Sequence, residues 1–303
     1  MGQCSHGSAD AKAERAAATA LALLPFLGRG ETHLKGPYRQ QIRAGVGFLI
    51  RLVTAHNGRA YEPEGGTLYT QGLVGIALSE CFAMSRDPGL KAPTQAVLNY
   101  IMETQDSAGG GWRYYPGQAG DTSVVGWQLM ALKSGFMAGI QVNPRTVTKA
   151  GTFLDSVQSD QGARYGYVDK SSPTDARSAV GLLSRMYTGW KKDHPGMQEG
   201  VKQLAKRGPT NDLYYDYYAT QIMHHMGGDL WTAWNGKMKP LLLSLQATDG
   251  DEAGSWFDGF GTGHASEVGG RLYCTSMATM ILEVYYRHLP MYQTESLERE
   301  FRE

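Results

Sequence analysis

A short pattern that recurs along the sequence places the strongest constraint on the fold. In its clearest copy a helix ends at Gln105, a glycine-rich loop leads to Trp112, and Asp121 then precedes a second helix. Weaker copies follow at intervals of about 50 residues, a period typical of repeat folds in which each unit is stabilised by its neighbours. The pattern therefore predicts one repeat domain over residues 11–303, after a flexible N-terminal tail of residues 1–10.

The apolar residues divide the chain into alternating segments of two kinds. Segments that are apolar nearly all round are typical of buried helices, and segments with charges on one face are typical of surface helices. The buried kind comprises residues 11–27, 68–85, 122–138, 176–190, 212–226 and 271–288. The surface kind comprises residues 37–55, 92–105, 144–159, 195–206 and 230–246, with a sixth candidate at 291–302. The alternation predicts an all-α fold, a single (α/α)6 barrel (toroid) of about 11–12 helices in two concentric layers with negligible sheet content.

Prolines and glycines mark the expected ends of these helices. Proline is tolerated in the first turn of a helix, and glycine readily adopts the left-handed conformation that follows a last turn. The prolines at expected starts are Pro93, Pro144 and Pro195, and the glycines after expected ends are Gly58, Gly139 and Gly227. Small residues within the buried segments, which predict close helix contacts, are Gly72, Gly126, Gly181 and Ala219.

Charge and cysteine usage exclude several classes of function. Lys and Arg number 29, Asp and Glu also number 29, and no polybasic run is present. This balance argues against binding to nucleic acid or to an anionic membrane surface. The three cysteines have no CxxC spacing, which argues against a disulfide framework and a structural zinc module and favours a reducing, cytoplasmic location. No run reaches the roughly 18–20 apolar residues that a membrane span requires.

The apolar run of residues 17–27 has the length of a signal-peptide core. However, Lys12, Glu14 and Arg15 precede it, no clean cleavage site follows, and Gly28 ends it as glycine ends a helix. We therefore expect this run to be the first buried helix of the domain.

The repeat itself resembles a known one. Gln105 with Gly-Gly-Trp112, and Gln246 with Gly-Ser-Trp256, match the QW-type repeat of squalene-hopene cyclases. Over about residues 15–290 the chain resembles the prenyltransferase/squalene-hopene cyclase repeat superfamily (the terpenoid cyclase/protein prenyltransferase α/α toroid). The resemblance implies a toroid whose central aromatic cavity binds an isoprenoid or another hydrophobic small molecule. It also implies that both tryptophans plug gaps between outer helices.

The chain departs from this family at the acid motif. Class II cyclases carry Asp-x-Asp-Asp-Thr-Ala at an inner-helix start, where residues 118–123 read Gln-Ala-Gly-Asp-Thr-Ser. Asp121 and Thr122 match the end of the motif, but Gly120 stands where the family has its proton donor. Without that acid, ordinary squalene-type cyclisation is not expected.

Three classes of function therefore remain open. The chain is a cyclase- or isomerase-like (or prenyltransferase-like) enzyme with a relocated acid, a non-catalytic toroid that binds a lipid, or a protein-interaction scaffold. Because many cyclases of this family use two toroids, the resemblance also leaves room for a second domain or subunit that completes the site.

Three carboxylates are the candidates for a relocated acid. Asp121 and Asp175 each stand at an expected inner-helix start, where an N-cap is the commoner role of aspartate. Both roles are compatible, because inner-helix N-termini surround the cavity mouth in such toroids. Asp216 lies inside an apolar helix and must find a partner if it is buried.

The candidates for substrate binding are mainly aromatic. Aromatic faces suit a carbocation or an apolar chain, although such clusters more often pack in the core. The candidates are Tyr69, Trp127, Tyr214, Tyr217, Tyr273 and Arg271. Arg271 either pairs with Asp216 or Glu267, or binds an anionic head group such as diphosphate.

The related protein prenyltransferases hold a zinc ion, and this site is poorly matched here. Aligning the inner helices leaves Asp216 and Cys274 in place of the family's ligands, with His225 as a candidate third ligand. A catalytic zinc site uses three protein ligands. We therefore expect no metal and no cofactor.

Overall fold

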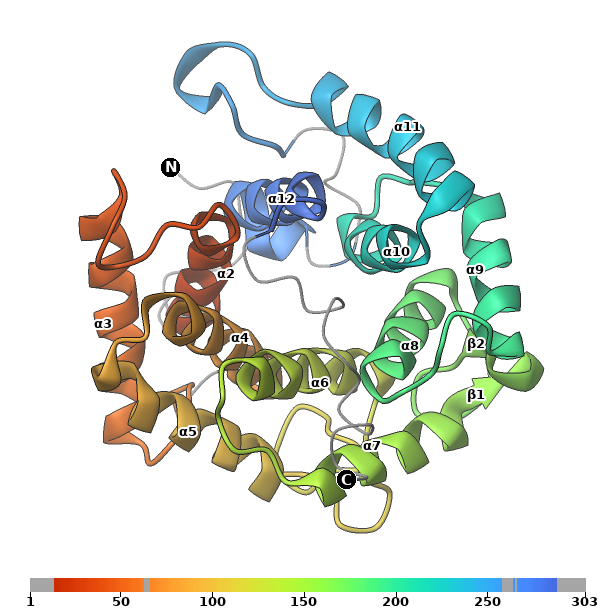
Figure 1. Ribbon diagram of the computed structural model, residues 1–303, viewed down its shortest axis with the longest axis horizontal. Coiled ribbons are helices and arrows are strands. Elements are labelled where there is room, and N and C mark those ends of the chain that lie inside the picture. Colours follow the sequence, from red (N-terminus) through yellow and green to blue (C-terminus); the bar gives the residue numbers. More distant parts are fainter. Residues whose placement is uncertain (1–13, 63–65, 258–263, 265, 288–303) are drawn as a thin grey trace.

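The computed structural model describes residues 14–62, 66–257, 264 and 266–287, and it shows two concentric rings of helices (Figure 1). The inner ring comprises α2 (Arg15–Gly28), α4 (Leu68–Ser85), α6 (Thr122–Met137), α8 (Asp175–Tyr187), α10 (Leu213–Met226) and α12 (Ser266–Glu283). The outer ring comprises α3 (Arg39–Ala55), α5 (Pro88–Glu103), α7 (Pro144–Val157), α9 (Pro195–Arg207) and α11 (Gly228–Ser244). The inner ring closes because α12 packs against α2, so the all-α toroid is confirmed.

Two parts of the sequence prediction lie outside the described residues. These are the N-terminal tail of residues 1–10 and the sixth surface segment at 291–302. Within the described part, strands are confined to β1 (Gln158–Ser159) and β2 (Arg164–Tyr165), an antiparallel pair. Two 3-10 turns, η1 (Asp160–Gly162) and η2 (Gly250–Glu252), complete the elements. No helix of this part is both long enough and apolar enough to cross a bilayer.

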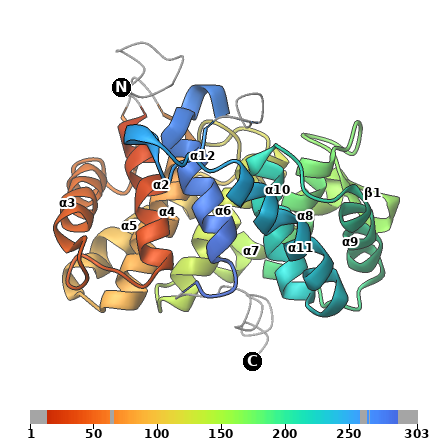
Figure 2. The same cartoon turned by 90° about the horizontal axis from the view of Figure 1, so that it is seen from above.

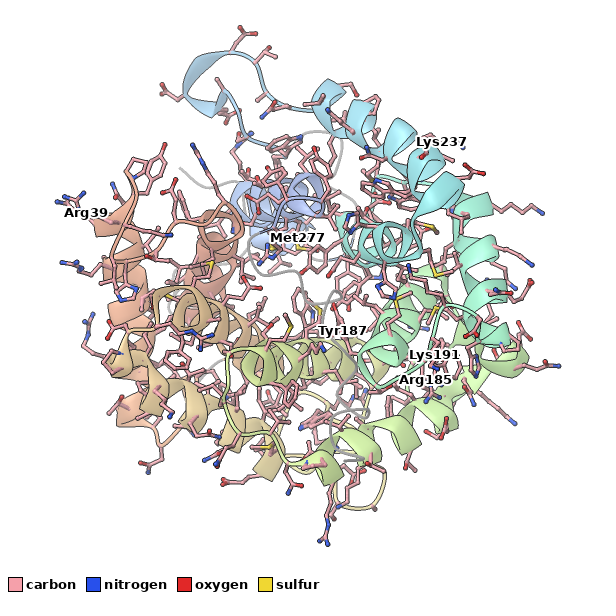
Figure 3. All side chains as sticks on the ribbon, in the orientation of Figure 1. Arg39, Arg185, Tyr187, Lys191, Lys237 and Met277 are labelled. Atoms are coloured by element: carbon pink, nitrogen blue, oxygen red, sulfur yellow. The ribbon has the colours of Figure 1, made fainter. Side chains whose placement is uncertain are left out.

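The polarity of the two rings follows the sequence pattern. In Figure 3, Arg39 and Lys237 project outward from the outer ring, whereas Met277 lies inside the inner ring. The side view shows the inner helices standing side by side within the outer layer (Figure 2). Most residues of α4, α6 and α10 are buried, as the absence of a charged face predicts, whereas Val268 and Leu272 of α12 are exposed.

Proline at the first helical position marks three outer-helix starts. Pro144 and Pro195 begin α7 and α9 as predicted. The prediction for Pro93 is wrong, because α5 begins at Pro88 and Pro93 lies inside the helix. The Asp87 side chain caps this earlier start by accepting a hydrogen bond from the Gly89 N–H at 2.9 Å.

Glycines allow the inner helices to approach closely. A Cβ on Gly126 would lie 2.4 Å from Cγ1 of Val180 on α8, and one on Gly72 would lie 3.0 Å from Cβ of Trp127 on α6. Both positions confirm the predicted close contacts between neighbouring inner helices. Gly181 differs, because its close neighbour is the ring of Tyr165 on β2.

The two QW tryptophans fasten the ends of outer helices. Trp112 donates from Nε1 to the Ile101 carbonyl at 2.7 Å, and Trp256 donates to the Leu242 carbonyl at 2.8 Å. Each carbonyl belongs to the last turn of an outer helix, where carbonyls lack the usual N–H donor four residues on and accept from other groups. Both indoles are buried, so the expected structural role of these tryptophans is confirmed.

A buried ionic cluster joins α4 to the end of α12. Arg287 Nη2 lies 2.6 Å from Glu80 Oε2, and Nη1 lies 3.7 Å from Glu283 Oε2. One guanidinium thus faces two buried carboxylates. The pKa of Glu283 is raised to about 8, because the effect of burial, aided by the charge of Glu80, outweighs the lowering by the charges of Arg287 and Arg29.

This cluster predicts a loss of stability as pH rises from mildly acidic to mildly alkaline. The pKa of Glu283 is about 8 in the folded protein, above its ordinary value of 4.5, so the unfolded chain releases this proton first and stability falls as pH rises from 4.5 to about 8. In wild type, this ionisation should lower the free energy of unfolding by about 1–3 kcal/mol between pH 6 and pH 9. Glu283→Gln should remove this loss. Urea unfolding at both pH values measures the change. Glu103→Gln, on the exposed face of α5, is the control and should leave the pH dependence of wild type intact; an unchanged dependence in Glu283→Gln would contradict the prediction.

Candidate functional site

Asp121 caps α6 at the end of the ring where inner-helix N-termini adjoin. Its Oδ1 accepts a hydrogen bond from the Val124 N–H at 2.9 Å, which confirms the predicted N-cap. Next to it, Thr122 donates from Oγ1 to the Gly166 carbonyl at 2.7 Å and thereby ties α6 to the loop before α8. We call this end of the ring the mouth.

The Asp121 carboxyl is fully buried and has a second set of contacts. Its Oδ2 accepts from the Tyr167 hydroxyl at 3.3 Å and lies 3.9 Å from Nε of Arg113. Burial raises the pKa of Asp121, while the bonds from Val124 and Tyr167 and the charge of Arg113 act in the opposite direction. The Tyr167 hydroxyl also lies 2.7 Å from the Tyr114 hydroxyl, so a chain of hydroxyls leads from the buried acid toward the partly exposed Tyr114.

Gly120, at the position of the family's proton donor, has no room for a side chain. A Cβ there would lie 2.7 Å from Cα of Gly111 and 2.8 Å from the ring of Phe153. The neighbour on one side is backbone, which cannot rotate away. The acid of the family is therefore excluded here by packing as well as by sequence.

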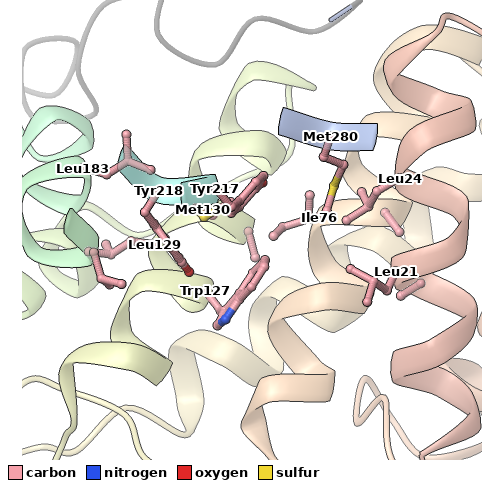
Figure 4. Packing of buried hydrophobic residues seen from close by; sticks show 14 of the residues in the cluster. Leu21, Leu24, Ile76, Trp127, Leu129, Met130, Leu183, Tyr217, Tyr218 and Met280 are labelled. Atoms are coloured by element: carbon pink, nitrogen blue, oxygen red, sulfur yellow. The ribbon is translucent and has the colours of Figure 1, made fainter. Parts of the chain in front are cut away.

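Aromatic side chains meet across the interior of the ring (Figure 4). Trp127 of α6 stacks on Tyr217 of α10, with ring centroids 5.9 Å apart and planes at 14°. It also makes an edge contact with Tyr218, at 5.8 Å. Because α8 separates α6 from α10 in the ring, these contacts span the interior. Leu24, Ile76 and Met280, from α2, α4 and α12, approach the same region.

Three more predicted aromatic residues lie between this group and the mouth. Tyr214 contacts Tyr218 at 5.1 Å, and Tyr69 contacts Tyr114 at 6.1 Å. Burial raises the pKa of both Tyr69 and Tyr214, and the charge of Asp121 raises each further, which places both phenols in the field of the acid. Burial also raises the pKa of Tyr273, with added contributions from Asp212 and Tyr214.

The four tyrosines of α10 divide between packing against the outer ring and contact with the interior aromatic group. Tyr215 points outward, contacts Trp234 of α11 at 6.2 Å and donates to the Leu204 carbonyl. Tyr214, Tyr217 and Tyr218 contact the interior aromatic group. Residues three and four apart share a helix face, so Tyr214, Tyr217 and Tyr218 lie on one face and Tyr215 lies on another.

The N-cap prediction for Asp175 is wrong. Thr174 caps α8 by accepting from the Arg177 N–H at 3.2 Å, and Asp175 is the first residue of the helix. The Asp175 carboxylate instead lies between two guanidiniums, 3.2 Å from Arg164 and 3.5 Å from Arg207. Sequence reading missed the threonine because two good capping residues stand side by side.

Asp216 is fully buried and holds the loop before α10. Both of its oxygens accept from the Thr210 N–H, at 3.0 and 3.3 Å. The pKa of Asp216 is raised to about 8, because the effect of burial outweighs the lowering by the bond from Thr210. This backbone contact is the partner that a buried carboxylate requires.

Arg271 is engaged by the loop after α11. Its Nη2 lies 2.8 Å from Glu252 and its Nη1 donates to Ser255 Oγ at 2.9 Å. The guanidinium also lies over the Phe257 ring, at 5.5 Å. These contacts direct it toward the outer loop and not toward the interior aromatic group.

The weak metal candidates do not form one site. Asp216 lies in the first turn of α10 and His225 in the last, so they are separated by about 13 Å of helix. Among the side chains that the structure describes, no three His, Cys, Asp or Glu residues come close enough to hold a metal ion.

One pair at the mouth was missed by sequence reasoning. Asp212 caps α10 with Oδ1, and its Oδ2 lies 2.5 Å from Nδ1 of His264. The His264 ring also contacts the Tyr214 ring, at 5.6 Å. The two residues are 52 positions apart in different repeats, so no local pattern joins them.

A groove of about 550 Å³ opens beside this pair, between the first turns of α8 and α10. It is lined by Thr174, Asp175, Ala176, Arg177, Arg207, Thr210, Asn211, Asp212, Tyr215 and His264. Most of these residues carry a polar or charged group, with charges of both signs, in contrast to the aromatic interior.

Comparison with known proteins identifies the fold alone. No protein-family model matches the sequence, and no curated protein matches it either. The structure is similar to cellobiose 2-epimerase from Bacillus thermoamylovorans (TM-score 0.61, 11% identity, 88% of this chain and 87% of that one). It is also similar to an α-1,6-mannanase from Salegentibacter sp. HEL1_6 (TM-score 0.59, 10% identity, 88% of each chain). A type II terpene cyclase from Scytonema, in complex with geranylgeranyl dihydroxybenzoate, has a TM-score of 0.53 at 12% identity over 88% of each chain.

The tight packing around Gly120 generates a stability prediction. Gly120→Ala should destabilise the protein by about 1–3 kcal/mol, because the methyl group meets the Gly111 backbone and the Phe153 ring. Thermal and urea unfolding measure the loss.

The matched control is Gly151→Ala on α7, where a Cβ would meet nothing within 4 Å. Alanine is the better helix former by about 1 kcal/mol, so this variant should be as stable as wild type or more stable. Equal stability of the two variants would show that the Gly111–Gly120 contact tolerates a side chain.

Proposed function

We propose that the interior of the ring binds an isoprenoid or similar apolar chain, and that Asp121 is the acid that acts on it. The observation that carries this proposal is a buried carboxyl with a raised pKa. Its charge acts on Tyr69 and Tyr214, which lie between it and the aromatic interior. A terpenoid cyclase-like reaction needs such a pairing of acid and aromatic wall.

The aromatic group suits this class of ligand. The faces of Trp127 and Tyr217 provide negative π-surfaces and a large apolar area. A carbocation within about 6 Å of such a face is attracted by roughly 0.5–2 kcal/mol per ring. The terpene cyclase from Scytonema, which holds a geranylgeranyl dihydroxybenzoate, supports the compatibility of this fold with an isoprenoid chain.

The surroundings of Asp121 suit proton donation. Burial favours the neutral carboxylic acid, which is the form that donates. Oδ1 accepts from the Val124 N–H at 2.9 Å, whereas Oδ2 has only the longer contact of 3.3 Å from the Tyr167 hydroxyl, so we assign the proton to Oδ2. The hydroxyls of Tyr167 and Tyr114 offer a route by which Oδ2 regains a proton after turnover.

The other two carboxylates fit this role less well. Asp175 lies between Arg164 and Arg207, and two adjacent cations favour its ionised form. Asp216 has the raised pKa of an acid, about 8, but both oxygens are directed at the Thr210 backbone. We therefore place Asp121 first and keep the other two as alternatives.

The competing interpretation is a toroid that binds an apolar ligand, or a protein partner, without chemistry. Trp127, one of six tryptophans, contributes a fluorescence signal for binding, because its indole lies in the interior aromatic group. Binding without turnover would favour this second interpretation.

The test is incubation with squalene, farnesyl diphosphate and geranylgeranyl diphosphate, followed by mass spectrometry of the products. We expect a rearranged product from at least one of them and a fall in rate of about 100-fold or more in Asp121→Asn. The amide keeps the cap acceptor, so the fold should persist.

Asp251→Asn, on the exposed 3-10 turn η2, is the matched control and should retain the wild-type rate. If turnover persisted in the triple variant Asp121→Asn, Asp175→Asn, Asp216→Asn, the assignment of the acid would be wrong. If no compound were turned over but all changed the tryptophan fluorescence, the non-catalytic interpretation would stand.

A further inference from the structure

We infer that the ligand carries a neutral, hydroxylated head group, such as a sugar or polyol, and that the groove at the mouth binds it. This inference rests on the proposed function, because it assigns the apolar part of the same ligand to the ring interior. It adds the chemical class of the other end.

The groove offers both hydrogen-bond donors and hydrogen-bond acceptors. Its donors are the guanidiniums of Arg177 and Arg207, its acceptors are the carboxylates of Asp175 and Asp212, and the amide of Asn211 supplies one group of each kind. A hydroxyl both donates and accepts, so a ligand with several hydroxyls uses such a lining fully.

The charges in the groove disfavour an ionic head group. Arg207 lies 3.5 Å from Asp175, and His264 pairs with Asp212, so most charges already have a partner of opposite sign. An anion in this groove would face two carboxylates, and a cation would face two guanidiniums. A neutral group meets neither penalty.

His264 is the group best placed to contact the head group. Its side chain is 64% exposed, while Asp212 fixes its orientation through Nδ1. With Nδ1–H donating to the carboxylate, Nε2 of the neutral imidazole is the ring nitrogen that acts as an acceptor, here for a ligand hydroxyl. The bond to Asp212 raises the pKa of His264, so the same nitrogen becomes a donor at lower pH.

A continuous series of side chains joins the groove to the interior. The His264 ring contacts Tyr214 at 5.6 Å, Tyr214 contacts Tyr218 at 5.1 Å, and Tyr218 contacts Trp127 at 5.8 Å. The Tyr273 hydroxyl, which is influenced by Asp212 and Tyr214, is buried and has no hydrogen-bond partner within the described part of the chain. A ligand oxygen at the junction of head group and chain would satisfy it.

The experiment compares four probes that share one tail and differ in head group. They are n-octyl β-D-glucopyranoside, n-octyl phosphate, n-octyltrimethylammonium and 1-octanol, each titrated below its micellar concentration by calorimetry and tryptophan fluorescence. We expect the glucoside to bind about tenfold more tightly than 1-octanol, and the two charged probes to bind no better than 1-octanol.

His264→Ala and Asn211→Ala should each remove most of this tenfold advantage and leave the binding of 1-octanol unchanged. His56→Ala, after α3 and outside the groove, is the matched control and should bind all four probes as wild type does. Thermal unfolding verifies that the variants are folded.

The outcomes separate the two proposals. Tightest binding of the phosphate or the ammonium probe overturns the assignment of a neutral head group. Equal binding of glucoside and 1-octanol shows that the groove binds no head group, while the proposed binding of an apolar chain stands. Failure of 1-octanol and the glucoside to perturb the tryptophan fluorescence overturns the proposed function and this inference together.

Discussion

The backbone hydrogen bond from the Asp121 N–H to the Trp112 carbonyl, 2.9 Å long, joins the structural half of the repeat to the mouth of the ring. On one side, the Trp112 indole fastens the last turn of α5 through the Ile101 carbonyl. On the other side, the same loop delivers Asp121 to the start of α6. The close approach of Gly111 and Gly120 lets the two ends of this loop meet without side chains between them. The position of the candidate acid is therefore set by the element that holds the outer ring together.

This coupling explains why the candidate acid stands at position 121 and not one residue earlier. A carboxylate at position 120 would need the space that Gly111 and Phe153 occupy, so acquiring it would mean rebuilding the loop. Asp121 already caps α6 with one oxygen, and the second oxygen faces the Tyr167 hydroxyl. An N-cap and a proton donor normally have opposite requirements, since a cap is strongest as a carboxylate. The proposed function divides the two roles between Oδ1, which caps the helix, and Oδ2, and burial favours the neutral form that a proton donor requires.

The sequence was sufficient for the fold because each helix boundary and each layer has a local cause. Apolar periodicity separates inner from outer helices, and Pro144, Pro195 and Gly139 mark ends through backbone chemistry alone. Local rules failed where two residues compete for one role, as at Thr174 with Asp175 and at Pro88 with Pro93. They also failed where contacts join distant repeats. Neither the stacking of Trp127 on Tyr217 nor the Asp212–His264 pair has a sequence signal, since ring closure alone brings these residues together.

The two ends of the ring are chemically distinct, and this difference gives a ligand one orientation. The mouth carries Asp121 and the polar groove, whereas Glu80, Glu283 and Arg287 form a buried ionic cluster between α4 and the end of α12. Tyr217 lies close enough to this cluster for Arg287 to lower its pKa and for the two carboxylates to raise it. An apolar chain that passed beyond Tyr217 would have to displace charges that are satisfied only by one another, at a cost of several kcal/mol. A chain that stopped at the Trp127–Tyr217 stack would meet aromatic and aliphatic surface, with its polar end left at the mouth beside Asp121.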